Sequence, residues 1–169
     1  TGQTLNELSR EWLFDPLGMN DTSWVERPQK LPDGTPLTGL LSTARDLSQI
    51  GLLLLNDGKN NGVDLVPAHY LQQLAKPGSD ENPAWGLCWW NNNQNHYLLP
   101  MREEKNRAGP AMPDAPADMI AARGAFGNYL LIVPCQGLVV ARTAKPQPKG
   151  QALPPFETGF WKLMQTIFE

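Results

Sequence analysis

The sequence is poor in residues that carry metal or redox chemistry. Its 169 residues include two cysteines, Cys88 and Cys135, and two histidines, His69 and His96, and their spacing matches no metal motif. The formal net charge of −3, with scattered basic residues, argues against a nucleic-acid partner or an anionic membrane surface. No apolar run approaches the ~20 residues of a membrane-spanning helix. We expect no metal site, no membrane span in this chain, and two free, partly buried thiols.

Motifs that mark an activated serine are also missing. The chain has no Gly-x-Ser-x-Gly turn and no glycine-rich phosphate loop before a helix. A lysine can activate a serine one helical turn before it, in Ser-x-x-Lys, but no serine stands three residues before any of the seven lysines. No tyrosine begins a Tyr-x-Asn motif either. A serine, histidine and aspartate triad could be assembled in principle, but neither histidine neighbours a nucleophile turn, so solvated or edge positions are the favoured interpretation of His69 and His96.

The composition is that of a globular protein with many loops. Apolar residues make up 41% and charged residues 18%, and there are sixteen prolines and fifteen glycines. The length fits one domain or a large part of one. Six tryptophans are many for this length, and four of them (Trp24, Trp85, Trp89 and Trp90) lie in or beside loop-rich stretches. These four could line a substrate pocket or fill the core.

Apolar periodicity predicts helices first and antiparallel strands afterwards. Capping patterns begin helices at Thr4 and Thr43, and a proline begins a shorter one. Helices are expected over residues 4–14, 42–55, 67–75 and 156–168; strands over 85–90, 96–100, 119–122, 129–133 and 138–142; a loop over 26–38; and a linker over 145–155. This order predicts an α+β fold in which helices cover an antiparallel sheet.

The segment from Ala122 to Pro134 is the most informative part of the chain. Two glycines, Gly124 and Gly127, lie between apolar runs that are typical of strands. One interpretation is a glycine-rich hairpin or bulge. The other is a strand end that presents backbone N–H groups to a substrate oxygen, as enzymes do when they stabilise an oxyanion.

Several short stretches, in this order, resemble a known enzyme family. They read TGQTL at 1–5, FDPLGM at 14–19, DTSW at 21–24, GLLSTARDL at 39–47, LLLNDG at 53–58 and WGLCWW at 85–90. The chain is thus similar to the C-terminal half of bacterial serine β-lactamase-related hydrolases, the group of class C β-lactamases, DD-peptidases, esterases and 6-aminohexanoate-dimer hydrolase. The resemblance implies part of a β-lactamase/transpeptidase-like fold. Residues 1–76 would be mainly helical, with a piece of the helical subdomain, and residues 84–169 would supply strands and the terminal helix.

The resemblance also assigns a site. Ala122-Arg123-Gly124 takes the place of the family's third motif, Lys-Thr-Gly or a relaxed form of it. The backbone N–H of Ala125 would then be one donor of the oxyanion hole, and Arg123, Gly124 and Phe126 would bind substrate. Alignment on Gly-Ala-Phe-Gly would instead move the motif two or more residues upstream. The family implies no cofactor, an ester, amide or peptide substrate, and a periplasmic or secreted location.

The family's serine, lysine and tyrosine would all lie before Thr1. We therefore expect residues 1–169 alone to lack acyl-transfer activity, and to self-associate or pair with the missing N-terminal catalytic part. The parent protein would be an esterase, amidase or peptidase rather than a true β-lactamase. The alternative is a non-catalytic binding or assembly module on the same scaffold, which the missing Ser-x-x-Lys motif would also fit.

Overall fold

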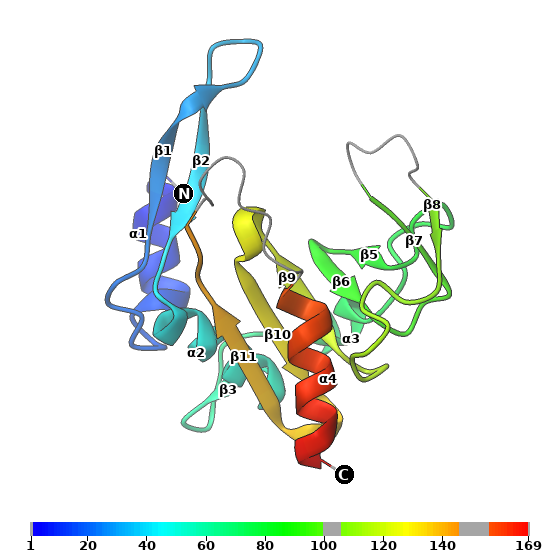
Figure 1. Cartoon of the computed structure of the whole chain (residues 1–169). Helices are drawn as coiled ribbons and strands as arrows, with labels where there is room; N and C mark the ends of the chain where they lie inside the picture. Colours follow the sequence, from blue (N-terminus) through cyan, green and yellow to red (C-terminus); the bar gives the residue numbers. More distant parts are fainter. Residues whose placement is uncertain (1, 100–105, 146–155, 169) are drawn as a thin grey trace.

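The fold is built around one five-stranded antiparallel sheet (Figure 1). The computed structural model describes residues 2–99, 106–145 and 156–168. The sheet has the strand order β11-β10-β9-β6-β5, and its strands are β5 (Trp85–Gly86), β6 (Trp89–Asn91), β9 (Ile120–Arg123), β10 (Tyr129–Val133) and β11 (Leu138–Arg142). Helix α4 (Phe156–Phe168) covers one face and helix α2 (Ala44–Leu55) lies against the other. This α+β arrangement confirms the predicted fold class.

The main core lies between the sheet and α4. Side chains alternate along a strand, so Leu131 and Val133 of β10 share one face and both are fully buried. They pack with Met119, Ala121 and the almost inaccessible Trp161 of α4. Burying a large apolar side chain contributes about 1.5–3 kcal/mol. This cluster therefore fixes α4 on the sheet, as the apolar spacing of residues 156–168 predicts.

The N-terminal helix is confirmed, but its second half is wider than an α-helix. Thr4 and Glu7 form both hydrogen bonds of the predicted capping box ahead of α1 (Leu5–Ser9). The chain then continues as the π-helical η1 (Arg10–Phe14), where the Asp15 N–H donates to the Arg10 carbonyl five residues earlier. Phe14, the last residue of η1, is buried. It belongs to a second core cluster, which consists of Phe14, Leu17, Met19 and Leu53.

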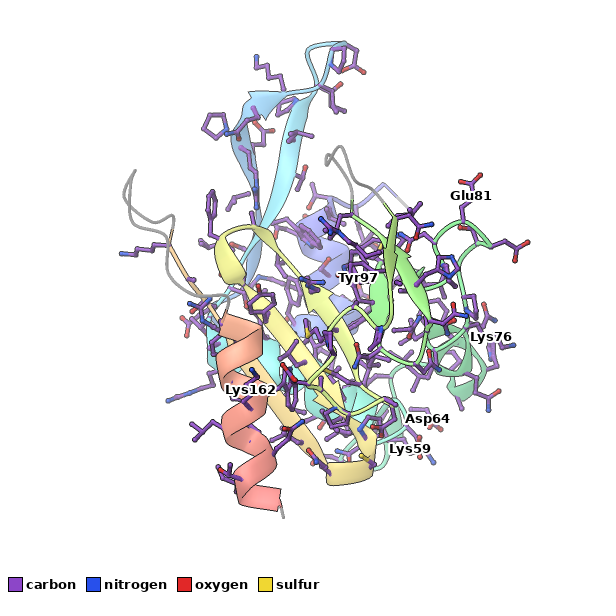
Figure 2. The ribbon with its side chains drawn as sticks, turned by 45° about the vertical axis from the view of Figure 1, so that its right-hand side comes forward. Lys59, Asp64, Lys76, Glu81, Tyr97 and Lys162 are labelled. Carbon is purple, nitrogen blue, oxygen red and sulfur yellow. The ribbon has the colours of Figure 1, made fainter. Side chains whose placement is uncertain are left out.

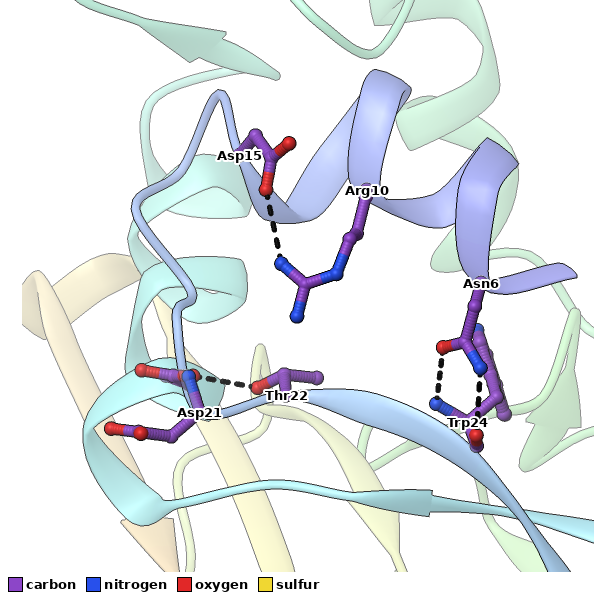
Figure 3. Close-up of polar contacts among 7 residues, drawn as sticks. Asn6, Arg10, Asp15, Asp21, Thr22 and Trp24 are labelled. Atoms are coloured by element: carbon purple, nitrogen blue, oxygen red, sulfur yellow. Dashed lines mark hydrogen bonds and ion pairs between the residues drawn. The ribbon is translucent and has the colours of Figure 1, made fainter.

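Polar contacts tie this helix to the strand that follows it (Figure 3). Asn6 accepts from the Trp24 N–H at 2.8 Å and donates to the Trp24 carbonyl at 2.9 Å. The Trp24 indole N–H donates to the Ser9 hydroxyl at 2.8 Å. Arg10 forms an ion pair with Asp15 at 3.2 Å. Trp24 is therefore a structural residue that packs on the second core cluster.

The loop predicted over residues 26–38 is wrong. These residues belong to a hairpin of β1 (Ser23–Lys30) and β2 (Pro36–Leu41) that projects from the body of the molecule (Figure 1). Its prolines misled the sequence interpretation, because a proline interrupts a central strand. Here each strand has a single partner, so the missing N–H of a proline is tolerated on the edge that has no neighbouring strand. The pairing is also irregular between Glu26 and Lys30, where Pro28 lies.

The single strand predicted over residues 85–90 is also wrong. The chain turns back at Leu87 and Cys88, which have φ values of 47° and 67°, so that β5 pairs with β6. Such a two-residue hairpin turn usually carries asparagine and glycine, and Leu-Cys gives no such signal. Trp85 consequently faces Trp90 across the hairpin, with ring centroids 5.1 Å apart. Trp85 and Trp90 therefore lie on two paired strands and not on one continuous strand.

The remaining predicted helices and strands are confirmed within a few residues. The other elements are β3 (Lys59–Asn60), β4 (Val63–Asp64), α3 (Ala68–Leu74), β7 (His96–Leu98), β8 (Asn106–Ala108), η2 (Ala125–Gly127) and η3 (Pro134–Gln136). The Lys59 ammonium lies 3.7 Å from Asp64 across the β3–β4 hairpin (Figure 2). Most of the predicted linker, residues 146–155, lies outside the described residues. Both cysteines are free as predicted but exposed rather than partly buried.

Candidate functional site

The candidate site is the tip loop, residues 124–128, which joins β9 to β10. On β9, only Ile120 and Ala121 pair with β6, so β9 continues beyond the end of this neighbour before it reaches the loop. The Gly124 N–H donates to the Asn128 carbonyl at 2.8 Å and closes the loop. Gly124 itself is extended, with φ −105° and ψ 172°. The two glycines therefore form a structured hairpin tip, and the strand end lies at the surface.

Ala125 occupies the outermost turn of the tip loop. It is exposed and begins the short 3₁₀ helix η2. Its carbonyl accepts from the Asn128 N–H at 3.3 Å and from the Asn128 side-chain amide at 2.7 Å. Within the described ranges, no group accepts a hydrogen bond from its N–H. Ala125 thus offers an available backbone donor on a residue whose carbonyl is fixed.

Phe126 shares the exposed tip with Ala125. Its side chain is 60% exposed and its φ is 63°, a left-handed conformation that non-glycine residues seldom adopt. Such backbone outliers occur at functional sites more often than elsewhere. Gly124, Ala125 and Phe126 are all exposed and form one surface at the tip loop.

Arg123 lies apart from that surface. Its guanidinium carbon is 5.3 Å from the centre of the Trp90 ring, which stabilises the cation by a cation–π contact. The side chain lines a pocket of about 210 Å³ together with Tyr97 (labelled in Figure 2), Asp114 and Trp161. Arg123 therefore follows the tip loop in sequence but contributes to the face of the sheet that α4 covers.

The sequence interpretation missed residues that hold the tip loop in place. Asn128 bonds to Ala125, and Arg142 donates to the Gly127 carbonyl from the neighbouring strand β11. The structural register places Arg142 opposite Tyr129, only two residues past Gly127. A predicted β10–β11 hairpin could have suggested this proximity, because antiparallel pairing brings its first and last residues together.

The tryptophans divide between core and surface. Trp90 and Trp161 are buried, whereas Trp12 and Trp85 are 60% and 38% exposed. Trp85 packs its edge against Trp90, so it extends the buried cluster outward. In the part of the chain that the structure describes, no group of three metal-ligating side chains comes together. No helix among those residues has the length and apolarity required to cross a membrane.

Comparison with known proteins adds a family match and two similar folds. The family model Beta-lactamase matches residues 1–154. A Bacillus anthracis protein assigned as a 6-aminohexanoate-dimer hydrolase has a TM-score of 0.63 at 21% identity, over 99% of this chain and 38% of its own. A Bacteroides dorei DSM 17855 protein assigned as a beta-lactamase has a TM-score of 0.60 at 16% identity, over 98% of this chain and 52% of its own. No curated protein matches the chain.

Proposed function

Because this chain belongs to the beta-lactamase family, we propose that it is the C-terminal portion of a serine hydrolase that works through an acyl-serine. The chain spans 38% and 52% of the lengths of the two solved proteins described above, which leaves room for further catalytic segments in a longer polypeptide. Ser-x-x-Lys and Tyr-x-Asn would lie in such a preceding segment. The substrate would be a small ester, amide or peptide.

The observation that carries this proposal is the backbone N–H of Ala125, an exposed residue just beyond the end of β9, for which the described residues supply no hydrogen-bond acceptor. In acyl transfer the serine oxygen bonds to the substrate carbonyl carbon, and the carbonyl oxygen becomes an oxyanion. The bond to the leaving oxygen or nitrogen then breaks, and the leaving group takes the proton that the serine lost to the base. Water hydrolyses the acyl-serine by the same steps. A fixed N–H aimed at the oxyanion lowers both barriers.

The neighbouring residues would bind substrate rather than react with it. Phe126 offers an exposed apolar surface to an acyl or leaving group, and Gly124 keeps the strand end free of a side chain. A Cβ on Gly124 would lie 3.3 Å from the Asn128 Cβ, which is a tight contact. Arg123 is held on Trp90, so its positive charge would act from the α4 face and not from the tip loop.

Replacing Ala125 with proline tests the proposed role of its N–H in the complete hydrolase. Proline removes the N–H but fits the first position of a short helix, and extended Gly124 is compatible with a following proline. We expect kcat for an ester substrate to fall about 10²–10³-fold, which is the usual effect of losing one oxyanion donor. Thermal unfolding should remain close to that of the unmodified protein.

Ala125→Ser is the matched control, because it changes the side chain and keeps the N–H. It should retain nearly all of the activity. Equal rates for Ala125→Pro and Ala125→Ser would show that this N–H takes no part in the reaction. A complete protein that hydrolyses no ester, amide or peptide would favour the alternative, a non-catalytic module on the same scaffold.

A further inference from the structure

A row of side chains on the α4 face of the sheet lies next to the tip loop. Arg123, Tyr129 and Arg142 occupy paired positions on β9, β10 and β11, so all three side chains leave the same face. Phe156, the first residue of α4, stacks on Tyr129 with ring centroids 5.8 Å apart. The end of the sheet that carries the tip loop is thus the end where α4 begins.

Arg142 connects this row to the loop. Its guanidinium donates a hydrogen bond to the Gly127 carbonyl and lies over the Phe156 ring, 4.8 Å from the ring centre. Arginine can make both contacts at once because its planar group stacks on a ring while its N–H groups point outward at the edges. Gly127 has φ +83°, and a Cβ there would collide with the guanidinium. The positive φ favours glycine at 127, and a Cβ there would also displace the guanidinium from its present position.

Asn128 fixes the other half of the loop. Its side-chain amide donates to the Ala125 carbonyl at 2.7 Å, and its side-chain carbonyl accepts from the Ala144 N–H at 2.7 Å. Its backbone N–H and carbonyl bond to Ala125 and Gly124. Asn128 thus ties Ala125 to the chain that leaves β11. Gly124, Ala125, Gly127 and Asn128 are thus each held by at least one hydrogen bond.

We propose that Arg142 is a positioning residue for the oxyanion donor. It holds the Gly127 carbonyl, and Asn128 holds the Ala125 carbonyl, so that the Ala125 N–H keeps a fixed direction. Through its stacking on Phe156, Arg142 also makes the start of α4 part of the support of the site. This inference rests on the proposed function for its catalytic consequence, but the ordering of the loop by Arg142 can be measured independently.

The catalytic test uses Arg142→Met in the complete hydrolase. Methionine keeps an unbranched apolar stem against Phe156 but cannot donate to Gly127. We expect kcat to fall about 10–100-fold because a small displacement of a catalytic group has effects of this size, with KM unchanged within about twofold. Arg142→Lys, which can still donate to Gly127, should recover most of kcat. The control is Arg45→Met on exposed Arg45 of α2, which should leave both constants unchanged.

If Arg142 served only the stability of the fold, Arg142→Met would lower the amount of folded protein. It would not lower kcat selectively while KM stays unchanged. Equal kcat for Arg142→Met and Arg45→Met would overturn the positioning role. So would a loss in Arg142→Met that Arg142→Lys does not recover at all.

A second measurement does not depend on activity. Hydrogen exchange of the Gly124 and Asn128 amides, which bond within the tip loop, should accelerate about tenfold or more in Arg142→Met and not in Arg45→Met. Gly127→Ala should accelerate it as well. The matched Gly137→Ala, also at positive φ (+58°) but with open space around it, should leave it unchanged. Unchanged exchange in Arg142→Met would overturn the inference even if the protein is an active hydrolase. Faster exchange in a protein without hydrolase activity would refute the proposed function alone.

Discussion

At the scale of single residues, Asp46 shows how one side chain can serve two segments. Its N–H is capped by the Thr43 hydroxyl at 3.1 Å, as the sequence predicts for the start of α2. Its carboxylate, however, accepts from the Asp21 N–H at 2.8 Å and from the Thr22 hydroxyl at 2.7 Å. Asp46 is only 4% exposed, so these bonds replace the water that its carboxylate loses. Asp46 therefore joins the beginning of β1 to α2.

Cys135, in the turn after β10, should react slowly with alkylating reagents. Its thiol donates to the Asp118 carboxylate at 3.1 Å, and this hydrogen bond, with smaller contributions from desolvation and charge, raises the pKa of the thiol. Only the thiolate is nucleophilic, so a raised pKa means less thiolate at any given pH near neutrality. We expect the alkylation rate of Cys135, followed by mass spectrometry of the peptides, to keep rising with pH beyond the range usual for a free thiol.

Asp118→Asn removes the negative charge and should shift the Cys135 profile to lower pH. Cys88, which is also exposed, serves as the reference thiol in the same sample. A Cys135 profile that does not move on substitution would contradict the role given to Asp118.

The sequence indicates Ala125 but not its supports, for a physical reason. Glycines flanked by apolar runs predict a sharp turn, and the family resemblance then selects the N–H after Gly124. Arg142 is 17 residues farther along and lies in a strand of ordinary composition. Its role depends on strand pairing and on which face of the sheet α4 covers. The β10–β11 pairing was predictable from the sequence, but the face of the sheet that α4 covers, and hence the contact of Arg142 with Phe156, was not.

At the scale of elements, α2 packs tightly against the sheet at Gly51. A Cβ at this position would collide with Val139 of β11 and lie 3.2 Å from Leu130 of β10. We expect Gly51→Ala to lower the free energy of unfolding by about 1–2 kcal/mol. Overpacking typically costs about 1–3 kcal/mol, and the better helix propensity of alanine offsets up to about 1 kcal/mol of that. Urea denaturation measures the difference.

Gly159 of α4 provides the matched control for Gly51. It is exposed, and nothing surrounds the position of its absent Cβ. Gly159→Ala should therefore raise the free energy of unfolding by about 0.5–1 kcal/mol through helix propensity alone. Equal effects of the two substitutions would show that α2 does not pack on β11 at Gly51 as described.

Elements whose apolar residues form a clear helical or strand pattern were predictable from the sequence. Elements whose formation depends mainly on pairing with another strand were not. The central strands β10 and β11 read as apolar runs on either side of Pro134-Cys135-Gln136-Gly137, and they form as predicted. The β1–β2 hairpin was missed because its residues are mostly exposed and include prolines, so they carry no apolar alternation. The turn at Leu87 and Cys88 was missed because neither residue favours a positive φ.

At the scale of the whole molecule, large apolar side chains remain exposed on several elements. Trp12 is 60% exposed, Leu41 59%, Leu163 63% and Ile167 65%. Contiguous exposed apolar surface is typical of interfaces, and Leu163 and Ile167 lie four residues apart on α4. Together with the share of each similar protein that the chain spans, it supports our proposal that residues 1–169 pair with a preceding part of the domain or with one another.

We propose that this chain supplies a backbone oxyanion donor, the Ala125 N–H, to a serine that lies before Thr1. The most direct test of this claim is labelling of the complete polypeptide and of residues 1–169 alone with a fluorophosphonate, followed by mass spectrometry of the peptides. We expect one labelled serine in the complete protein, within a Ser-x-x-Lys motif upstream of Thr1, and no label on residues 1–169 alone. A label on any serine within residues 1–169, or none on the complete protein, would contradict the claim.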